Sequence, residues 1–224
     1  MNTVQLLFIS FAFISVFHIL AIILKLKILR MISKCFIVPL LLAAYIASGG
    51  ANKYLLPVFA LVFGWIGDVL LIKGKNKTNF LLGLTSFLTG HLFYIASFLY
   101  ILGFFYFERL ALKLDIASIL VFIPVVFVLA MVVFRLVKPV KGLRLPVILY
   151  MTVLVVMNLI GFQVFLFNPG LAGLLILSGC FCFMISDTVL AYYTFRKIKI
   201  SASVLIMYFY IIAQAKIIIG LLLL

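Results

Sequence analysis

Long apolar runs, separated by short basic or Gly- and Pro-containing breaks, constrain this chain more than any other feature. A helix that crosses a bilayer needs about 20 mostly apolar residues, and the 224 residues hold such runs from end to end. Only 10% of the residues are charged, which is too few to cover the surface of a water-soluble domain. The pattern excludes a soluble enzyme and a disordered chain, and it predicts an all-α integral membrane protein.

We predict a single multi-pass transmembrane domain, residues 1–224, with eight spans. Strands of a membrane barrel are excluded, because they alternate apolar and polar residues over about ten positions and these runs are apolar on both parities. Each expected span ends at a Lys/Arg cluster, at a Gly, Pro or Asn break, or at both. The expected spans are 4–24, 34–48, 54–72, 79–103, 116–136, 145–167, 171–195 and 202–223.

The distribution of Lys and Arg predicts the orientation. The odd-numbered connections between these spans hold 14 of the 18 Lys and Arg residues, whereas the even-numbered ones hold Lys53, Arg109 and Lys113. Cytoplasmic loops carry the excess of cations, so the odd loops should be cytoplasmic and both termini outside. The formal charge of +14 thus reflects topology, and no nucleic-acid partner is expected. Lys-rich loops favour the inner membrane of a bacterial cell.

Two of the four carboxylate residues lie inside expected spans. Asp68 follows Phe63-Gly-Trp-Ile-Gly on the third span, and Asp187 follows Phe183-Met-Ile-Ser on the seventh. Each Asp comes after a small residue and before an apolar one, and both spans run from outside to cytoplasm in the expected topology. This match indicates two parallel four-helix repeats, with halves 1–110 and 111–224.

An Asp at the centre of a span costs about 2.5–3.5 kcal/mol on insertion scales. A structural clamp between helices is one explanation, but transmembrane hydrogen bonds contribute only about 0.6–2 kcal/mol. We therefore expect Asp68 and Asp187 to be catalytic, with one acid protonated and the other ionised, as general acid–base chemistry requires. A small proton-coupled transporter using the same acids is the alternative.

Further polar groups in the spans are candidates for supporting roles, with interhelical packing as the competing explanation. His91 lies near the middle of the fourth span, and Lys34 opens the second at the cytoplasmic interface, where it either anchors the helix or binds a phosphate. The other candidates form two pairs, each on one helical face: Tyr150 with Asn158, and Tyr210 with Gln214. No metal-binding or cofactor motif is present, so neither a metal nor a cofactor is expected.

The order of these motifs resembles the YhhN-like lysoplasmalogenases, eight-span membrane hydrolases. The resemblance covers nearly the whole chain. It rests on Lys34 with a following Pro39, Gly67-Asp68-Val-Leu-Leu, the block from Phe80 to His91-Leu-Phe-Tyr94, Pro146-Val-Ile-Leu-Tyr150 through Met157, Ser186-Asp187-Thr-Val-Leu-Ala191, and Tyr208 to Gln214. The family usually places Pro directly after the second-span Lys, whereas Cys35 and Phe36 intervene here.

The resemblance implies hydrolysis of the sn-1 vinyl-ether bond of a choline or ethanolamine lysoplasmalogen, giving a fatty aldehyde and a glycerophospho-head group. The expected partners are this lysophospholipid and the membrane lipids. A vinyl ether opens after protonation of its β-carbon, so the reaction needs an acid and a base, and the two aspartates supply them. In this hypothesis His91 positions or relays a proton and Lys34 holds the head-group phosphate.

Overall fold

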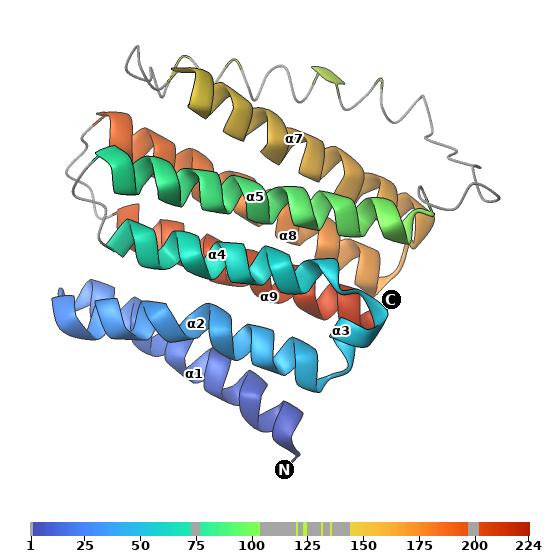
Figure 1. The fold of residues 1–224 in the computed structure, drawn as a ribbon, viewed down its shortest axis with the longest axis horizontal. Coiled ribbons are helices and arrows are strands. Elements are labelled where there is room, and N and C mark those ends of the chain that lie inside the picture. Colours follow the sequence, from blue (N-terminus) through green and yellow to red (C-terminus); the bar gives the residue numbers. More distant parts are fainter. Residues whose placement is uncertain are drawn as a thin grey trace. The chain divides into compact units, whose positions relative to one another are not determined.

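The described part of the computed structural model is helical throughout (Figure 1). The structure describes residues 2–72, 77–103, 144–196 and 202–224, and the isolated positions 120, 123, 124, 131 and 135. Its helices are α1 (Thr3–Ile23), α2 (Lys27–Ala47), α3 (Gly50–Lys53), α4 (Leu56–Ile72), α5 (Lys77–Ile101), α7 (Arg144–Phe167), α8 (Leu171–Arg196) and α9 (Ala202–Leu223).

Six of these helices are long and apolar enough to cross a membrane: α1, α2, α5, α7, α8 and α9. Helix α4 is apolar as well but has 17 residues, somewhat fewer than the usual span of about 20. The predicted all-α, multi-pass class is confirmed for the described residues. The expected fifth span, 116–136, lies almost wholly outside them, so the number of spans and the positions of the termini stay predictions.

One predicted boundary is wrong by about two helical turns. The second span was expected at 34–48, but α2 begins at Lys27 and ends at Ala47. The prediction places the cluster Lys25, Lys27, Arg30 and Lys34 in the first connection, whereas all of these residues except Lys25 lie within α2. Lys34 therefore lies seven residues inside the helix, roughly 10 Å along its axis at 1.5 Å per residue.

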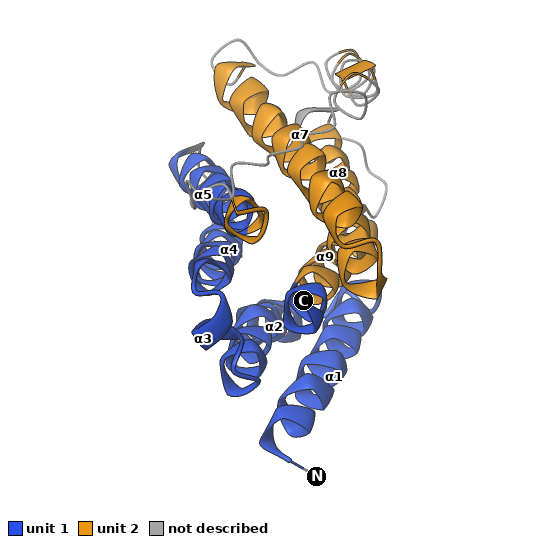
Figure 2. Ribbon diagram, turned by 90° about the vertical axis from the view of Figure 1, so that its right-hand side faces the viewer, with its two compact units in different colours: residues 1–97, 218–224 blue, residues 98–217 orange. Residues whose placement is uncertain are grey.

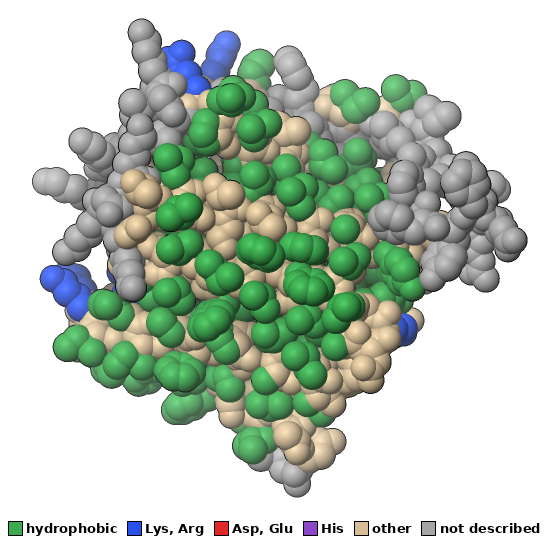
Figure 3. All heavy atoms as spheres, viewed as in Figure 1, with side chains coloured by type: hydrophobic (Ala, Val, Ile, Leu, Met, Phe, Trp, Pro, Cys, Tyr) green, Lys and Arg blue, Asp and Glu red, His purple; other side chains and the backbone are tan. Residues whose placement is uncertain are grey.

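The described helices expose many large apolar side chains, and several polar side chains are buried within an otherwise apolar core. Large apolar side chains such as Phe13 and Ile28 are exposed, whereas Asp68, Asp187 and His91 are buried. The face drawn in Figure 3 shows hydrophobic side chains over the described helices, with Lys and Arg only at its margins. Such a surface suits hydrocarbon solvent, and the buried polar groups are the functional candidates.

The chain divides into two compact units, coloured separately in Figure 2. Unit 1 is Met1–Ser97 with Ile218–Leu224, and unit 2 is Phe98–Ile217. In unit 1, α4 and α5 approach closely: a Cβ added at Gly90 would lie 3.0 Å from the Ala60 carbonyl oxygen. Ser86 on α5 donates a hydrogen bond of 2.6 Å to the Phe63 carbonyl on α4. Small residues and hydroxyls commonly join helices inside membranes, where apolar burial against lipid gives little driving force.

In unit 2, close approaches at glycines and a hydrogen bond from a serine hydroxyl likewise join the helices. A Cβ added at Gly161 on α7 would lie 2.9 Å from the Cys180 sulfur on α8. One at Gly179 on α8 would lie 3.1 Å from the Ala213 carbonyl oxygen on α9. Ser186 Oγ donates a 3.0 Å bond to the Ile206 carbonyl, again from α8 to α9. These contacts join α8, which carries Asp187, to α7 on one side and to α9 on the other.

Candidate functional site

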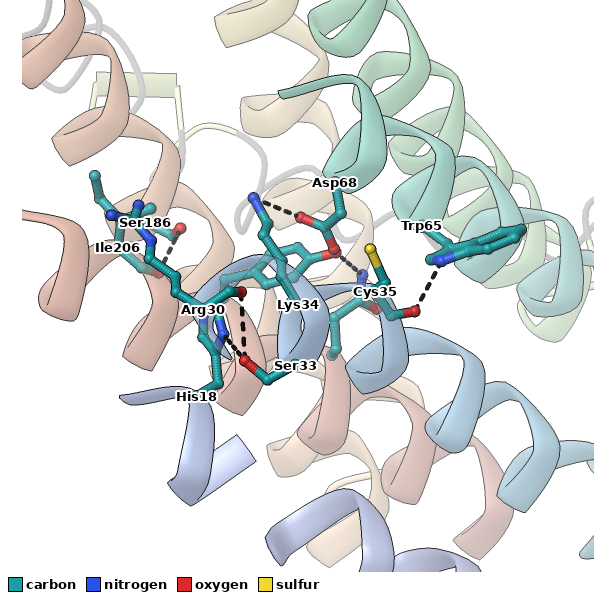
Figure 4. Close-up of polar contacts among 11 residues, drawn as sticks. His18, Arg30, Ser33, Lys34, Cys35, Trp65, Asp68, Ser186 and Ile206 are labelled. Atoms are coloured by element: carbon teal, nitrogen blue, oxygen red, sulfur yellow. Dashed lines mark hydrogen bonds and ion pairs between the residues drawn. The ribbon is translucent and has the colours of Figure 1, made fainter. Parts of the chain in front are cut away.

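Asp68 is buried on α4 and forms an ion pair with Lys34 on α2 (Figure 4). The Lys34 Nζ lies 3.2 Å from Asp68 Oδ1, and the two side chains are 15% and 3% exposed. An ion pair requires an ionised carboxylate and a charged ammonium. The pair joins the two helices at a point seven residues inside α2 and four residues before the end of α4.

A buried histidine from α1 lies beside this pair. Ser33, the residue before Lys34, donates from its hydroxyl to the Leu29 carbonyl at 2.7 Å. The 2.8 Å contact between His18 Nδ1 and Ser33 Oγ therefore has the imidazole as donor. His18 also interacts electrostatically with Lys34 and Arg30. Helix α1 thus supports the segment of α2 that carries Lys34.

A second contact joins α2 and α4 next to the ion pair. The indole Nε1 of Trp65 donates to the Cys35 carbonyl oxygen at 3.0 Å (Figure 4). Cys35 follows Lys34 in the chain, and Trp65 precedes Asp68 by three residues. The sequence contained a signal for this contact that our prediction did not use, namely a Pro at 39 and the single Trp of the chain within one turn of an intramembrane Asp.

Asp187 on α8 has a neutral partner on α7. The Tyr150 hydroxyl donates to Asp187 Oδ2 at 2.6 Å, and both residues are buried. Tyr150 was predicted as a supporting residue, but the sequence grouped it with Asn158 on its own helix and gave no indication of contact with Asp187. A phenol can donate to the carbonyl oxygen of a protonated carboxyl as well as to a carboxylate.

Helix α9 adds Tyr210 and Gln214 to the surroundings of Tyr150. Tyr210 interacts electrostatically with Tyr150, and its ring meets Phe183 of α8 edge-on with 5.8 Å between centroids. Gln214 Nε2 donates a long bond of 3.4 Å to the Tyr210 hydroxyl. The predicted pairing of Tyr210 with Gln214 on one face is therefore observed as a contact.

Asn158 lies two turns along α7 from Tyr150. Its amide nitrogen donates to the Leu154 carbonyl at 2.8 Å and to the Cys180 carbonyl at 3.3 Å. Its Oδ1 is buried and has no hydrogen-bond partner among the residues that the structure describes. These contacts make Asn158 a tie between α7 and α8, which is the packing alternative of our prediction.

The predicted site residues thus fall into two groups. Lys34 and Asp68 meet in unit 1, where His91 is buried on α5, and Tyr150, Asp187, Tyr210 and Gln214 gather in unit 2. Each group holds one intramembrane carboxyl with a defined hydrogen-bonding or ionic partner. No group of three or more His, Cys, Asp or Glu able to hold a metal ion is found in the described ranges.

A chain of apolar helices with buried carboxyls on two of them is a multi-pass helical membrane protein. Within that class, it belongs to the YhhN family, whose model matches residues 29–221. The match begins inside α2, so α1 and His18 lie outside it. Comparisons with curated proteins and with solved structures gave no match.

Proposed function

We propose that this protein is a lysoplasmalogenase, which hydrolyses the sn-1 vinyl-ether bond of choline or ethanolamine lysoplasmalogens. The observation that carries the proposal is the pair of buried aspartates with unlike partners, Lys34 for Asp68 and Tyr150 for Asp187. Membership of the YhhN family supports it, since the lysoplasmalogenases that the chain resembles belong to that family.

The reaction needs a proton donor, a water molecule and a proton acceptor. Protonation of the vinyl-ether β-carbon gives an oxocarbenium ion. Water then adds to the carbon next to oxygen and loses a proton to a base, and the hemiacetal collapses to the aldehyde and the glycerol hydroxyl. One water is consumed, and the cycle closes when the proton gained by the acceptor returns to the donor, so the reaction involves no change of oxidation state.

The partners suggest which aspartate has which role. Asp68 is held in an ion pair and is therefore the carboxylate, which stabilises the cation and activates water. Asp187 is hydrogen-bonded by a neutral phenol, an arrangement compatible with a protonated carboxyl, and it is the proton donor. This division into a proton donor and a carboxylate is the one that the two carboxyls of a glycosidase use.

Lys34 has a second role in this proposal. An ammonium has three N–H donors, and Asp68 Oδ1 uses one of them. The remaining donors bind the head-group phosphate, so that substrate binding and the charge of Asp68 depend on the same cation. With the odd loops cytoplasmic, the lipid is taken from the inner leaflet. His91 and Gln214 are the candidates for completing the proton path.

The test is aldehyde release by the purified protein in lipid nanodiscs. We expect free fatty aldehyde from an alkenyl lysophosphoethanolamine and none from its acyl ester analogue. Asp68→Asn and Asp187→Asn should each lower turnover by about 10²–10⁴-fold, the usual contribution of general acid–base groups. Equal turnover of the ester, or full turnover by both variants, would refute the proposal. Proton uptake by proteoliposomes without aldehyde release would indicate the transporter instead.

A further inference from the structure

Pro39 leaves a gap in the backbone hydrogen bonds of α2. It lies inside the helix, and proline has no N–H, so the bond that residue 39 would donate to the carbonyl of Cys35 cannot form. In membrane helices, a carbonyl freed by proline is satisfied by a neighbouring helix, a side chain, an ordered water or a local change of helix geometry. The Cys35 carbonyl is therefore open to a donor from outside its own helix.

Trp65 on α4 is that donor. Its Nε1 lies 3.0 Å from the Cys35 oxygen, and an indole N–H can only donate. The Trp65 side chain is 40% exposed, so burial of the ring is a weak reason for its orientation. The hydrogen bond to Cys35 supplies a stronger one.

The bond and the ion pair connect the same two helices within one turn of each. Cys35 is the neighbour of Lys34 on α2, and Trp65 and Asp68 are three residues apart on α4, which places them on neighbouring faces of one turn. One contact between two helices leaves rotation about it open. Two contacts, one directional and one ionic, fix both the separation and the rotation of the helices at Asp68.

We propose that Pro39 and Trp65 act together as positioning residues. Pro39 frees the Cys35 carbonyl, Trp65 binds it, and the resulting contact sets the distance and angle between Lys34 and Asp68. The contact itself is independent of the proposed function, and only its effect on turnover rests on that function. Neither residue touches the reacting atoms in this scheme.

The first test is spectroscopic and needs no substrate. Trp65 is the single Trp of the chain, so the ultraviolet resonance Raman band that reports indole N–H hydrogen bonding comes from this residue alone. We expect a hydrogen-bonded indole in the wild type and a weaker bond in Pro39→Ala, where the new N–H competes for the Cys35 carbonyl. An unbonded indole in the wild type would overturn the proposal.

The second test separates positioning from stability through three variants. Trp65→Phe removes the donor and should lower the melting temperature by several degrees and turnover by about tenfold, because small displacements of catalytic groups slow reactions strongly. Pro39→Ala should keep or raise the melting temperature yet also lower turnover. The double variant Trp65→Phe/Pro39→Ala should regain the melting temperature of the wild type, because the backbone N–H of residue 39 now donates to the Cys35 carbonyl. Its turnover should stay low.

The matched control is Ile66→Ala, which removes a similarly exposed side chain beside Trp65 that has no hydrogen-bonding group. Its turnover should stay within about twofold of the wild type, as for a surface change away from the site. If turnover follows the melting temperature in all the variants, or if Pro39→Ala is fully active, Pro39 and Trp65 are structural only and the proposal fails.

A protein without aldehyde release would refute the proposed function but would still allow the positioning role to be tested. The coupling between Lys34 and Asp68 is then measured from melting temperatures, using Lys34→Met, Asp68→Asn and the double variant. We expect this coupling to shrink by at least half when Trp65 is replaced by Phe. The same coupling in both backgrounds would overturn the inference.

Discussion

The two intramembrane aspartates are alike in sequence but differ in what holds them. Asp68 follows Gly67 and pairs with a cation on α2, whereas Asp187 follows Ser186 and accepts a hydrogen bond from a phenol on α7. The residue before each acid also differs in its contact. A Cβ at Gly67 would lie 2.8 Å from the Phe87 ring, while Ser186 donates to the α9 backbone.

This difference shows that two acids in similar sequence motifs can have different partners in the folded chain. A full charge beside a buried carboxylate offsets much of the cost of keeping it ionised, and removal of that charge leaves a costly group behind. A neutral donor contributes less and can serve either protonation state. In the proposed function, these unlike partners are the reason for giving different tasks to two residues that the sequence alone treats as equivalent.

The largest expected effect comes from removing one acid at a time. Asp187→Asn keeps the shape of the side chain but cannot deliver a proton, and it should lower turnover by about 10²–10⁴-fold. The loss of turnover for Asp68→Asn should lie in the same range. The double variant should have a turnover little lower than that of either single variant, because the effects of residues that act in one reaction are not additive. If aldehyde release by the double variant instead decreased by the product of the two single decreases, the two acids would act independently.

Breaking the ion pair should have the largest effect on stability. Lys34→Met leaves the Asp68 carboxylate buried without its cation and should lower the free energy of unfolding by about 3 kcal/mol. Lys34→Met/Asp68→Leu removes both charges and should recover most of that loss, although it is inactive. Denaturation in mixed micelles measures both variants, and an unchanged stability for Lys34→Met would show that the pair is not a stabilising contact.

Removing the neutral partner should cost less than removing the cation. Tyr150→Phe deletes the 2.6 Å hydrogen bond to Asp187 and should lower the free energy of unfolding by about 1–2 kcal/mol. Turnover should decrease by about tenfold, since one positioned hydrogen bond is lost. Tyr192→Phe on α8, which changes a hydroxyl away from this contact, is the control. A loss for Tyr150→Phe as large as that for Lys34→Met would remove the distinction between the two sites.

The smallest effect should come from the residue before Asp187. Ser186→Ala removes the 3.0 Å bond to the Ile206 carbonyl and should cost about 1 kcal/mol, with turnover nearly unchanged. Gly67→Ala, the corresponding change in unit 1, must displace the Phe87 ring and should cost about 1–3 kcal/mol. Thermal melting of both variants checks this order, and a reversed order would show that Phe87 moves aside easily.

The sequence predicted the class of fold because apolar runs of about 20 residues have few other uses in a protein. It misplaced the start of α2, since basic residues within a helix and basic residues in a loop have the same composition. The boundary could have been found from the spacing of Lys27, Arg30 and Lys34, which are three and four residues apart as on one helical face.

The sequence predicted which residues are candidates for the site, but it did not predict which of them are in contact. An Asp inside an apolar span is costly in free energy, so Asp68 and Asp187 can be identified as site candidates without knowledge of their partners. Their partners depend on how different helices pack: Lys34 on α2 reaches Asp68 on α4 across 34 residues, and Tyr150 on α7 reaches Asp187 on α8 across 37. Periodicity within one helix could not supply these pairings. The role of His91 stays a prediction.

The contact of His18 with Ser33 has a practical consequence for expression of this protein. A chain trimmed to the family-matched residues 29–221 would lose the imidazole that covers Ser33 and the first two residues of α2. Ser33 precedes the cation that pairs with Asp68, so such a truncation would disturb the site from a helix that the family match does not include. Residues 1–28 should therefore be kept in any recombinant form.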